Sequence, residues 1–237
     1  MDCQIAKAIK LDSQPVAVIK TDTIPEHALQ FKEGKWGCVV ALLASAAQGR
    51  ITACSRKTTC CPGGNVGLGF QPFPSGIEYF LSVGGKGPRE GEFYKETPEL
   101  AKAYITSVPE ITAKEAVVFK PLNLLEKAEK PEAIVFLVNA DQLSALVTLA
   151  NYDRPTQDNV RIKFGAGCNQ ALLYPMSDQE AGNGICTIGL TDPSARKCID
   201  KALLSFSIPY HRFLEMESKV SGSFLTKDTW LRLSERI

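Results

Sequence analysis

A short pattern occurs twice in the chain, and this repeat constrains the fold more than any other feature of the sequence. Residues 37–43 and residues 167–173 both read G-C-x-x-A-L-L. Each copy follows an apolar segment typical of a buried strand, and each precedes a cysteine, a glycine-bearing apolar segment and a Pro-Ser pair. A chance match is the alternative, but the shared order of the flanking features favours an internal duplication. The sequence therefore predicts two related halves, residues 1–125 and 126–237, packed as one compact unit.

Segments with the character of strands and of helices alternate along both halves. Continuous apolar, β-branched runs predict strands covered on both faces, and apolar side chains three or four residues apart predict helices. This alternation is typical of an α/β fold, with an α+β arrangement as the alternative. The expected strands are residues 15–19, 115–119, 133–138, 160–164 and 185–190, and the expected helices include residues 36–48, 141–152 and 193–204.

Charge and hydropathy exclude several classes of protein. The 237 residues carry 27 basic and 26 acidic side chains, which gives a formal net charge of +1. A near-neutral chain without a basic stripe is unlike a protein that binds nucleic acid or an acidic membrane surface. The longest apolar runs are too short to cross a bilayer, and the N-terminus lacks a run of signal-peptide length. We therefore expect a cytoplasmic protein that binds neither nucleic acid nor membrane; a homo-oligomer is compatible with the sequence.

The chain contains eight cysteines and only two histidines. The spacing C-x₂-C is absent, and His27 and His211 lie far from each other and from any cysteine pair, so the chain lacks the signature of a structural zinc site. The same absence argues against thioredoxin-type and ferredoxin-type motifs. What remains is a set of scattered thiols, which an iron–sulfur cluster tolerates because its ligands need not be close in sequence.

Two cysteines occupy matched positions in the repeat. Cys38 and Cys168 follow Gly37 and Gly167 at the start of a predicted helix. Free backbone amides and the helix dipole favour a thiolate at such a position, and glycine allows another group to approach the backbone closely. If a pseudo-twofold axis relates the halves, these two helix ends face each other across a shared cleft.

A third candidate is the segment Cys60-Cys61-Pro62-Gly63-Gly64. A Pro-Gly-Gly turn exposes the neighbouring cysteine and supplies amide donors for an anion or a cluster sulfide. Further along, residues 191–196 predict a helix cap, and Arg196 in its first turn is a candidate for holding a carboxylate or phosphate. The remaining cysteines lie on apolar faces and are expected to be core thiols: Cys3, Cys54, Cys186 and Cys198.

The chain also resembles a known family over most of its length. The resemblance is carried by W-G-C at 36–38, C-P-G-G-N-V-G-L-G-F at 61–70, G-I-E-Y-F-L-S at 76–82, A-G-C at 166–168, G-L-T-D at 189–192 and F-L-E-M-E at 213–217. These segments are similar to domain-of-unknown-function family 169, the ArCR family of anaerobic bacteria and archaea, which has no settled activity. The resemblance implies that Cys38, Cys61 and Cys168 belong to the family pattern, whereas Cys60 stands where glycine is more usual.

Together these features predict an iron–sulfur protein in which Cys38, Cys61 and Cys168 hold one [4Fe–4S] cluster at the junction of the halves, with Cys60 as a further candidate ligand. Such a cluster serves electron transfer with a redox partner, or reductive or Lewis-acid chemistry on a small molecule. No catalytic residue is indicated. The alternatives are a metal-free module for an anionic small molecule, and a thiol redox sensor that pairs Cys60 or Cys61 with Cys38 or Cys168. The backbone and side-chain groups expected around the cofactor are Gly37, Pro62, Gly63, Gly64, Gly167 and Arg196.

Overall fold

The computed structural model describes residues 1–59, 61–85 and 90–237. The chain forms two compact units, one of residues 1–70 and 111–237 and the other of residues 71–110. Cys60, a predicted cluster ligand, lies outside the described residues. Within the described part of the chain, no helix combines the length and the apolar character needed to cross a membrane.

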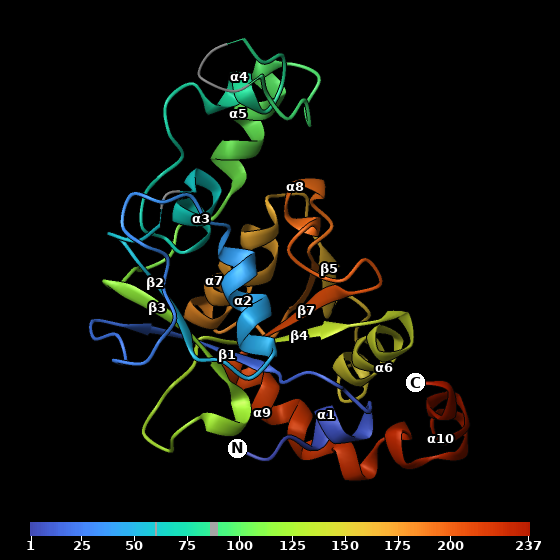
Figure 1. Ribbon diagram of the computed structural model, residues 1–237. Coiled ribbons are helices and arrows are strands. Elements are labelled where there is room, and N and C mark those ends of the chain that lie inside the picture. Colours follow the sequence, from blue (N-terminus) through green and yellow to red (C-terminus); the bar gives the residue numbers. More distant parts are fainter. Residues whose placement is uncertain (60, 86–89) are drawn as a thin grey trace. The chain divides into compact units, whose positions relative to one another are not determined.

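The larger unit is built on a seven-stranded sheet with the order β2-β3-β1-β4-β7-β6-β5 (Figure 1). Neighbouring strands are antiparallel, except for the parallel pair β5 and β6. The α/β fold predicted from the sequence is confirmed. The strands are β1 (Val16–Thr21), β2 (Thr52–Ser55), β3 (Ala116–Pro121), β4 (Ala133–Val138), β5 (Val160–Ile162), β6 (Cys186–Gly189) and β7 (Leu204–Pro209).

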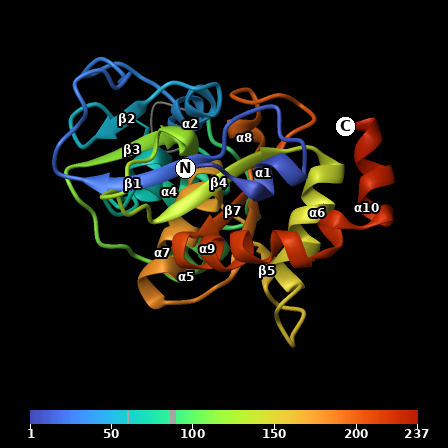
Figure 2. The ribbon, with the colours of Figure 1, turned by 90° about the horizontal axis from the view of Figure 1, so that it is seen from below.

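Helices cover both faces of this sheet. One face carries α2 (Val39–Ala47), α3 (Pro62–Gly67), the π-helix η2 (Asn169–Leu173), α7 (Tyr174–Ala181) and α8 (Pro193–Arg196). The opposite face, seen in Figure 2, carries α1 (Gln4–Ala8), α6 (Ala140–Asn151), α9 (Tyr210–Lys219) and α10 (Asp228–Leu233). Short 3-10 turns complete the unit: η1 (Leu122–Leu124), η3 (Val220–Gly222), η4 (Phe224–Thr226) and η5 (Ser234–Arg236).

Strand β4 shows why the sequence carries unbroken apolar runs. Successive side chains of a strand point to opposite faces of the sheet. Val135 and Leu137 therefore pack into the core beside α2, and Ile134 and Phe136 pack into the core beside α9. Because both faces are covered, every residue of the strand is apolar and buried.

The two predicted halves follow the same path through the sheet. Moving outward from the central antiparallel pair β1 and β4, one side has β3 and then β2, and the other has β7 and then β6. In the first half, α2 comes directly before the outer strand β2. In the second half, η2 and α7 come directly before the outer strand β6. This arrangement is compatible with the predicted duplication, which stays a prediction. The boundary proposed at residue 125 falls between β3 and β4, inside the larger unit.

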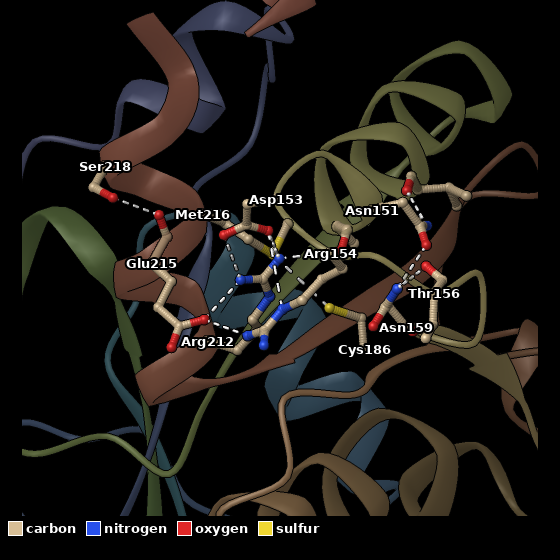
Figure 3. A network of polar contacts seen from close by, with 12 residues as sticks. Asn151, Asp153, Arg154, Thr156, Asn159, Cys186, Arg212, Glu215, Met216 and Ser218 are labelled. Carbon is tan, nitrogen blue, oxygen red and sulfur yellow. Dashed lines mark hydrogen bonds and ion pairs between the residues drawn. The ribbon is translucent and has the colours of Figure 1, made fainter. Parts of the chain in front are cut away.

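A network of charged groups fixes the α9 face of the larger unit (Figure 3). The side chain of Arg212 is fully buried, and it donates hydrogen bonds to Asp153, to Glu215 (2.6 Å) and to the carbonyl oxygen of Ala150 (3.1 Å). These bonds connect α9 to the end of α6. Since a buried guanidinium is stable only when its charge is paired, the network is a structural requirement of this face.

The smaller unit contains α4 (Ile77–Phe80) and α5 (Pro98–Ser107). The hydroxyl of Thr97 accepts a hydrogen bond from the Leu100 amide, and Pro98 occupies the first turn of α5, so this helix begins with a side-chain cap. The rings of Phe73 and Tyr104 meet edge to face with their centroids 6.4 Å apart. This aromatic contact ties α5 to the segment before α4.

Candidate functional site

Three of the predicted cysteines lie at the starts of helical segments, Cys38 and Cys61 with extended backbone angles and Cys168 with helical ones. Cys38 is the N-cap of α2, Cys61 is the N-cap of α3, and Cys168 is the N-cap of η2. The helix starts predicted at Cys38 and Cys168 are confirmed. The Pro-Gly-Gly segment after Cys61, predicted as a turn, is instead the first turn of α3 with Pro62 at its first position, a place that suits a residue without an amide proton.

Two of these cysteines meet at Gly63. A Cβ atom added to Gly63 would lie 3.7 Å from Sγ of Cys168 and 4.0 Å from Sγ of Cys61. The Cys168 thiol also donates a hydrogen bond of 2.9 Å to the Gly63 carbonyl oxygen. Residues 61 and 168, from the two predicted halves, therefore present their sulfur atoms to the same small volume.

Small residues allow the neighbouring backbones to come this close. A Cβ atom on Gly67 would lie 2.9 Å from Cβ of Cys168, and one on Gly64 would lie 2.6 Å from Cγ2 of Val39. Both distances are shorter than side chains tolerate, so α3 needs glycine where it packs on η2 and on α2.

Gly167 makes the corresponding close contacts on η2. Its added Cβ atom would lie 2.6 Å from Cβ of Ala195 in α8 and 3.7 Å from Cγ2 of Val40 in α2. The beginnings of α2 and η2 therefore lie close together. A Cβ atom added to Gly37 would lie 2.5 Å from the ring of Phe31. At both glycines the group that fills the space is a protein side chain.

Cys198, expected to be a core thiol, lies at this site instead. It follows α8, is only half-buried, and packs against the same core cluster as Cys38; burial and the charge on Cys38 raise the pKa of Cys198. The apolar spacing around Cys198 gave no indication of this position, because it brings together residues that are far apart in sequence. The three other cysteines assigned to the core, Cys3, Cys54 and Cys186, are buried as predicted.

Asp192 and Arg196 hold the segment that carries Cys198. The Asp192 carboxylate caps α8 through the Ser194 amide (3.0 Å), as predicted, and also accepts a hydrogen bond from the Gly167 amide (2.9 Å). The Arg196 guanidinium donates to the carbonyl oxygens of Leu190, Lys201 and Leu203. The arginine proposed from the sequence as an anion ligand therefore fixes the backbone on both sides of residue 198.

A comparison with known protein families finds a match over residues 4–219 to the uncharacterised ArCR family, domain-of-unknown-function family 169. The chain belongs to this family. The match confirms the resemblance seen in the sequence and spans all four cysteines of the site. No curated protein and no solved structure matches the chain, so the function of this ArCR-family protein has to be argued from its own residues.

The thiols of the ArCR-family site affect one another electrostatically. Burial raises the pKa of Cys168 well above its ordinary value, and negative charge at Cys61, Cys38 and Asp192 raises this pKa further. The pKa of Cys198 rises to about 11, first through burial and then through charge on Cys38. The sequence predicted that the helix start would favour a thiolate at Cys168. That prediction is wrong for the metal-free protein, because desolvation outweighs the attraction of the helix amides.

The site does not have the geometry of a single-ion centre. Among the residues described, no three histidine, cysteine, aspartate or glutamate side chains are placed to hold one metal ion. Such an ion needs all of its sulfur ligands about 2.3 Å from a single point. Of the described thiols, those of Cys61 and Cys168 lie near Gly63, and charge on Cys38 affects both Cys168 and Cys198.

Proposed function

We propose that this ArCR-family protein binds one [4Fe–4S] cluster through Cys38, Cys61 and Cys168. The observation that supports the proposal most directly is the convergence at Gly63, where the sulfur atoms of Cys61 and Cys168 both lie within 4.0 Å of the position of an added Cβ atom. Cys38 joins them because α2 begins beside Gly167. Residues from both predicted halves thus supply thiols to one place.

A multi-iron cluster suits this arrangement better than a single ion does. Each cysteine ligand of a cluster binds a different iron atom, so the sulfur atoms surround the cluster rather than one central point. The described thiols have the residue type that iron–sulfur clusters require and too wide a distribution for one ion. The proposal also places the protein in the cytoplasm, where thiols stay reduced.

The electrostatics of the site favour a cationic occupant. Metal binding requires thiolates, and in the metal-free protein the thiolate form of Cys168 is disfavoured by burial and by charge on neighbouring thiols. Iron cations remove that repulsion by neutralising the sulfur charges. The backbone amides at the starts of α2, α3 and η2 supply hydrogen-bond donors to cluster sulfur atoms, a contact that tunes reduction potential.

Pro62, Gly63, Gly64 and Gly167 form the backbone around the proposed cluster. Pro62 starts α3 directly after Cys61, and Gly63 lies between the sulfur atoms of Cys61 and Cys168. Gly63 has no side chain to separate its backbone from the occupant of the site, whereas Gly64 and Gly167 allow α3 and η2 to pack closely against Val39 and Ala195. When bound, the cluster supplies one-electron transfer to a redox partner, or, with an iron left open, a Lewis acid for a small molecule.

The test is an anaerobic preparation of the whole chain, with iron and acid-labile sulfide measured per protein and spectra recorded by absorption and electron paramagnetic resonance. We expect four iron and four sulfide per chain and a broad band near about 400 nm that is typical of such clusters. The Cys38→Ala and Cys61→Ala variants should lose most of the iron. Both residues are half-buried, so the substitutions leave the core intact.

Cys186→Ala is the matched control, because Cys186 is buried next to Met216 on the opposite face of the sheet. This variant should keep the full iron content. Wild-type protein without iron or sulfide, after anaerobic purification and chemical reconstitution, would overturn the proposal. A reversible disulfide in that iron-free protein would then favour the thiol-sensor alternative.

A further inference from the structure

We propose that Cys198 is the fourth thiolate ligand of the cluster, so that the cluster is closed to substrates and carries electrons. The inference rests on the proposed function. It assigns to Cys198 a metal-binding role that neither the sequence pattern nor the family match indicates.

The first argument is position. Ala195, the third residue of α8, packs against Gly167, which directly precedes Cys168. The Cys198 amide donates a hydrogen bond of 3.0 Å to the Ala195 carbonyl oxygen, so Cys198 closes the turn at the end of α8. Cys198 and Cys38 both pack against the same core cluster beside α2, and burial and the charge on Cys38 raise the pKa of Cys198. Cys198 therefore completes a group that already contains Cys38, Cys61 and Cys168.

The second argument is rigidity. The segment after α8 is irregular, and such a segment holds a metal ligand well only if its backbone is fixed. Arg196 supplies that fixation through hydrogen bonds to the carbonyl oxygens of Lys201 (2.6 Å), Leu203 and Leu190 (3.4 Å). The Asp200 carboxylate adds a hydrogen bond from the Ala202 amide (2.8 Å).

The third argument excludes the nearby Asp192 carboxylate as the fourth ligand. Asp192 is the carboxylate whose charge acts on Cys168, and it already accepts hydrogen bonds from the Gly167 amide, the Ser194 amide and the Ser194 hydroxyl. These bonds fix Asp192 as a structural cap. Cys198 instead offers a half-exposed thiol, with Lys197 nearby to counter part of the negative charge.

Four cysteine ligands have a functional consequence. Each iron of the cluster would be bound by one protein thiolate, two from residues 1–125 and two from residues 126–237. No iron would then be open to a substrate. A closed cluster of this kind exchanges electrons with a partner protein and does not act as a Lewis acid.

The test compares anaerobically prepared wild-type, Cys198→Ala, Cys198→Ser and Cys186→Ala protein. We expect Cys198→Ala to lose one of the four irons and to show the paramagnetic signal of an oxidised three-iron cluster. Cys198→Ser should keep the fourth iron with a lowered reduction potential, because serine oxygen replaces sulfur. Wild type and Cys186→Ala should keep four irons and a spectrum that does not respond to added small-molecule thiol.

The two failures are distinguishable. If wild-type protein holds no cluster, the proposed function fails, and the assignment of Cys198 fails with it. If wild type and Cys198→Ala hold the same iron content with identical spectra and reduction potentials, only the assignment of Cys198 is overturned. A disulfide between Cys38 and Cys198 in the cluster-loaded protein would overturn the assignment as well.

Discussion

Burial raises the pKa of several thiols in this protein. The side chain of Cys186 in β6 is fully buried, and its sulfur lies 3.9 Å from that of Met216. Burial raises its pKa from 9.0 to about 12. Cys3 behaves alike, because burial and the charge of Glu217 raise its pKa to about 12. Both thiols therefore stay protonated in the folded chain at pH values where they ionise in the unfolded chain.

This difference predicts a loss of stability in alkali. Above pH 9.0 the unfolded state releases a proton from residue 186, whereas the folded state keeps it up to about pH 12. Because the folded state binds more protons in this range, the free energy of unfolding falls as pH rises, by about 1.4 kcal/mol per pH unit for each such thiol. In metal-free Cys186→Ala protein the slope should be shallower by that amount.

Urea unfolding at a series of pH values measures this slope. Below pH 9.0 the variant and the wild type should differ by a constant offset, which reports the lost packing of the sulfur atom. Equal slopes for the two proteins above pH 9.0 would contradict the argument.

At the scale of elements, helix α3 is the least expected part of the site. It has glycine at positions 63, 64 and 67, and glycine disfavours helix formation by about 1 kcal/mol per residue relative to alanine. Packing supplies the stability that local propensity lacks. The backbone of α3 lies directly against Val39 of α2 and Cys168 of η2, and only glycine permits those contacts.

Gly63 and Gly67 form a matched pair for testing this packing. A Cβ atom at Gly67 would lie 2.9 Å from Cβ and 3.1 Å from the backbone carbon of Cys168, whereas one at Gly63 meets nothing closer than 3.6 Å. Gly67→Ala should therefore destabilise the metal-free protein by about 1–3 kcal/mol, the usual cost of overpacking. Gly63→Ala should leave its stability nearly unchanged. Thermal unfolding of both variants measures the difference, and equal melting temperatures would count against close packing at Gly67.

The sequence predicts helices and strands correctly where residues close together in the chain determine the local structure. The run from Ala133 to Val138 is apolar throughout because both of its faces are covered, and β4 occupies those six residues. The helix start at Cys38 follows from a glycine before a regular apolar pattern. Pro62-Gly63-Gly64 was interpreted as a turn because those residues favour turns, and the helical state depends on contacts with α2 and η2 that sequence spacing does not encode.

The site residues likewise divide into those with a local sequence signal and one that depends on long-range packing. Cys38, Cys61 and Cys168 were found from helix starts and glycine neighbours, which are local features. Cys198 was missed because its position near Cys38 depends on how α8 packs against Gly167. The π-helical geometry of η2, which often accompanies a functional site, was not predicted from the sequence.

At the scale of the whole molecule, the proposed cluster would link the two halves of the chain. The halves already share the central pair β1 and β4. On the α2 face, Cys38 and Cys61 come from residues 1–125, and Cys168 and Cys198 come from residues 126–237. A cluster bound by both sets would act as a cross-link that exists only in the folded state.

Removing the cluster should therefore lower the stability of the whole larger unit. A group bound only by the folded state adds about 4 kcal/mol when its concentration is about 1,000 times its dissociation constant. For a chain of this size that corresponds to a rise of roughly 10 °C in melting temperature. Calorimetry of the cluster-loaded protein and of chelator-treated protein, both kept anaerobic, measures the difference.

The pH dependence of this stabilisation tests its mechanism. Cluster binding needs thiolates, and the metal-free folded protein keeps Cys168 and Cys198 protonated, with the pKa of Cys198 at about 11. Binding must then release protons, so the stabilisation should increase as pH rises toward that value and decrease on acidification. Cys38→Ala, which lacks one proposed ligand, should show a smaller stabilisation at every pH. A difference in melting temperature that is independent of pH would mean that the metal does not bind through these thiols.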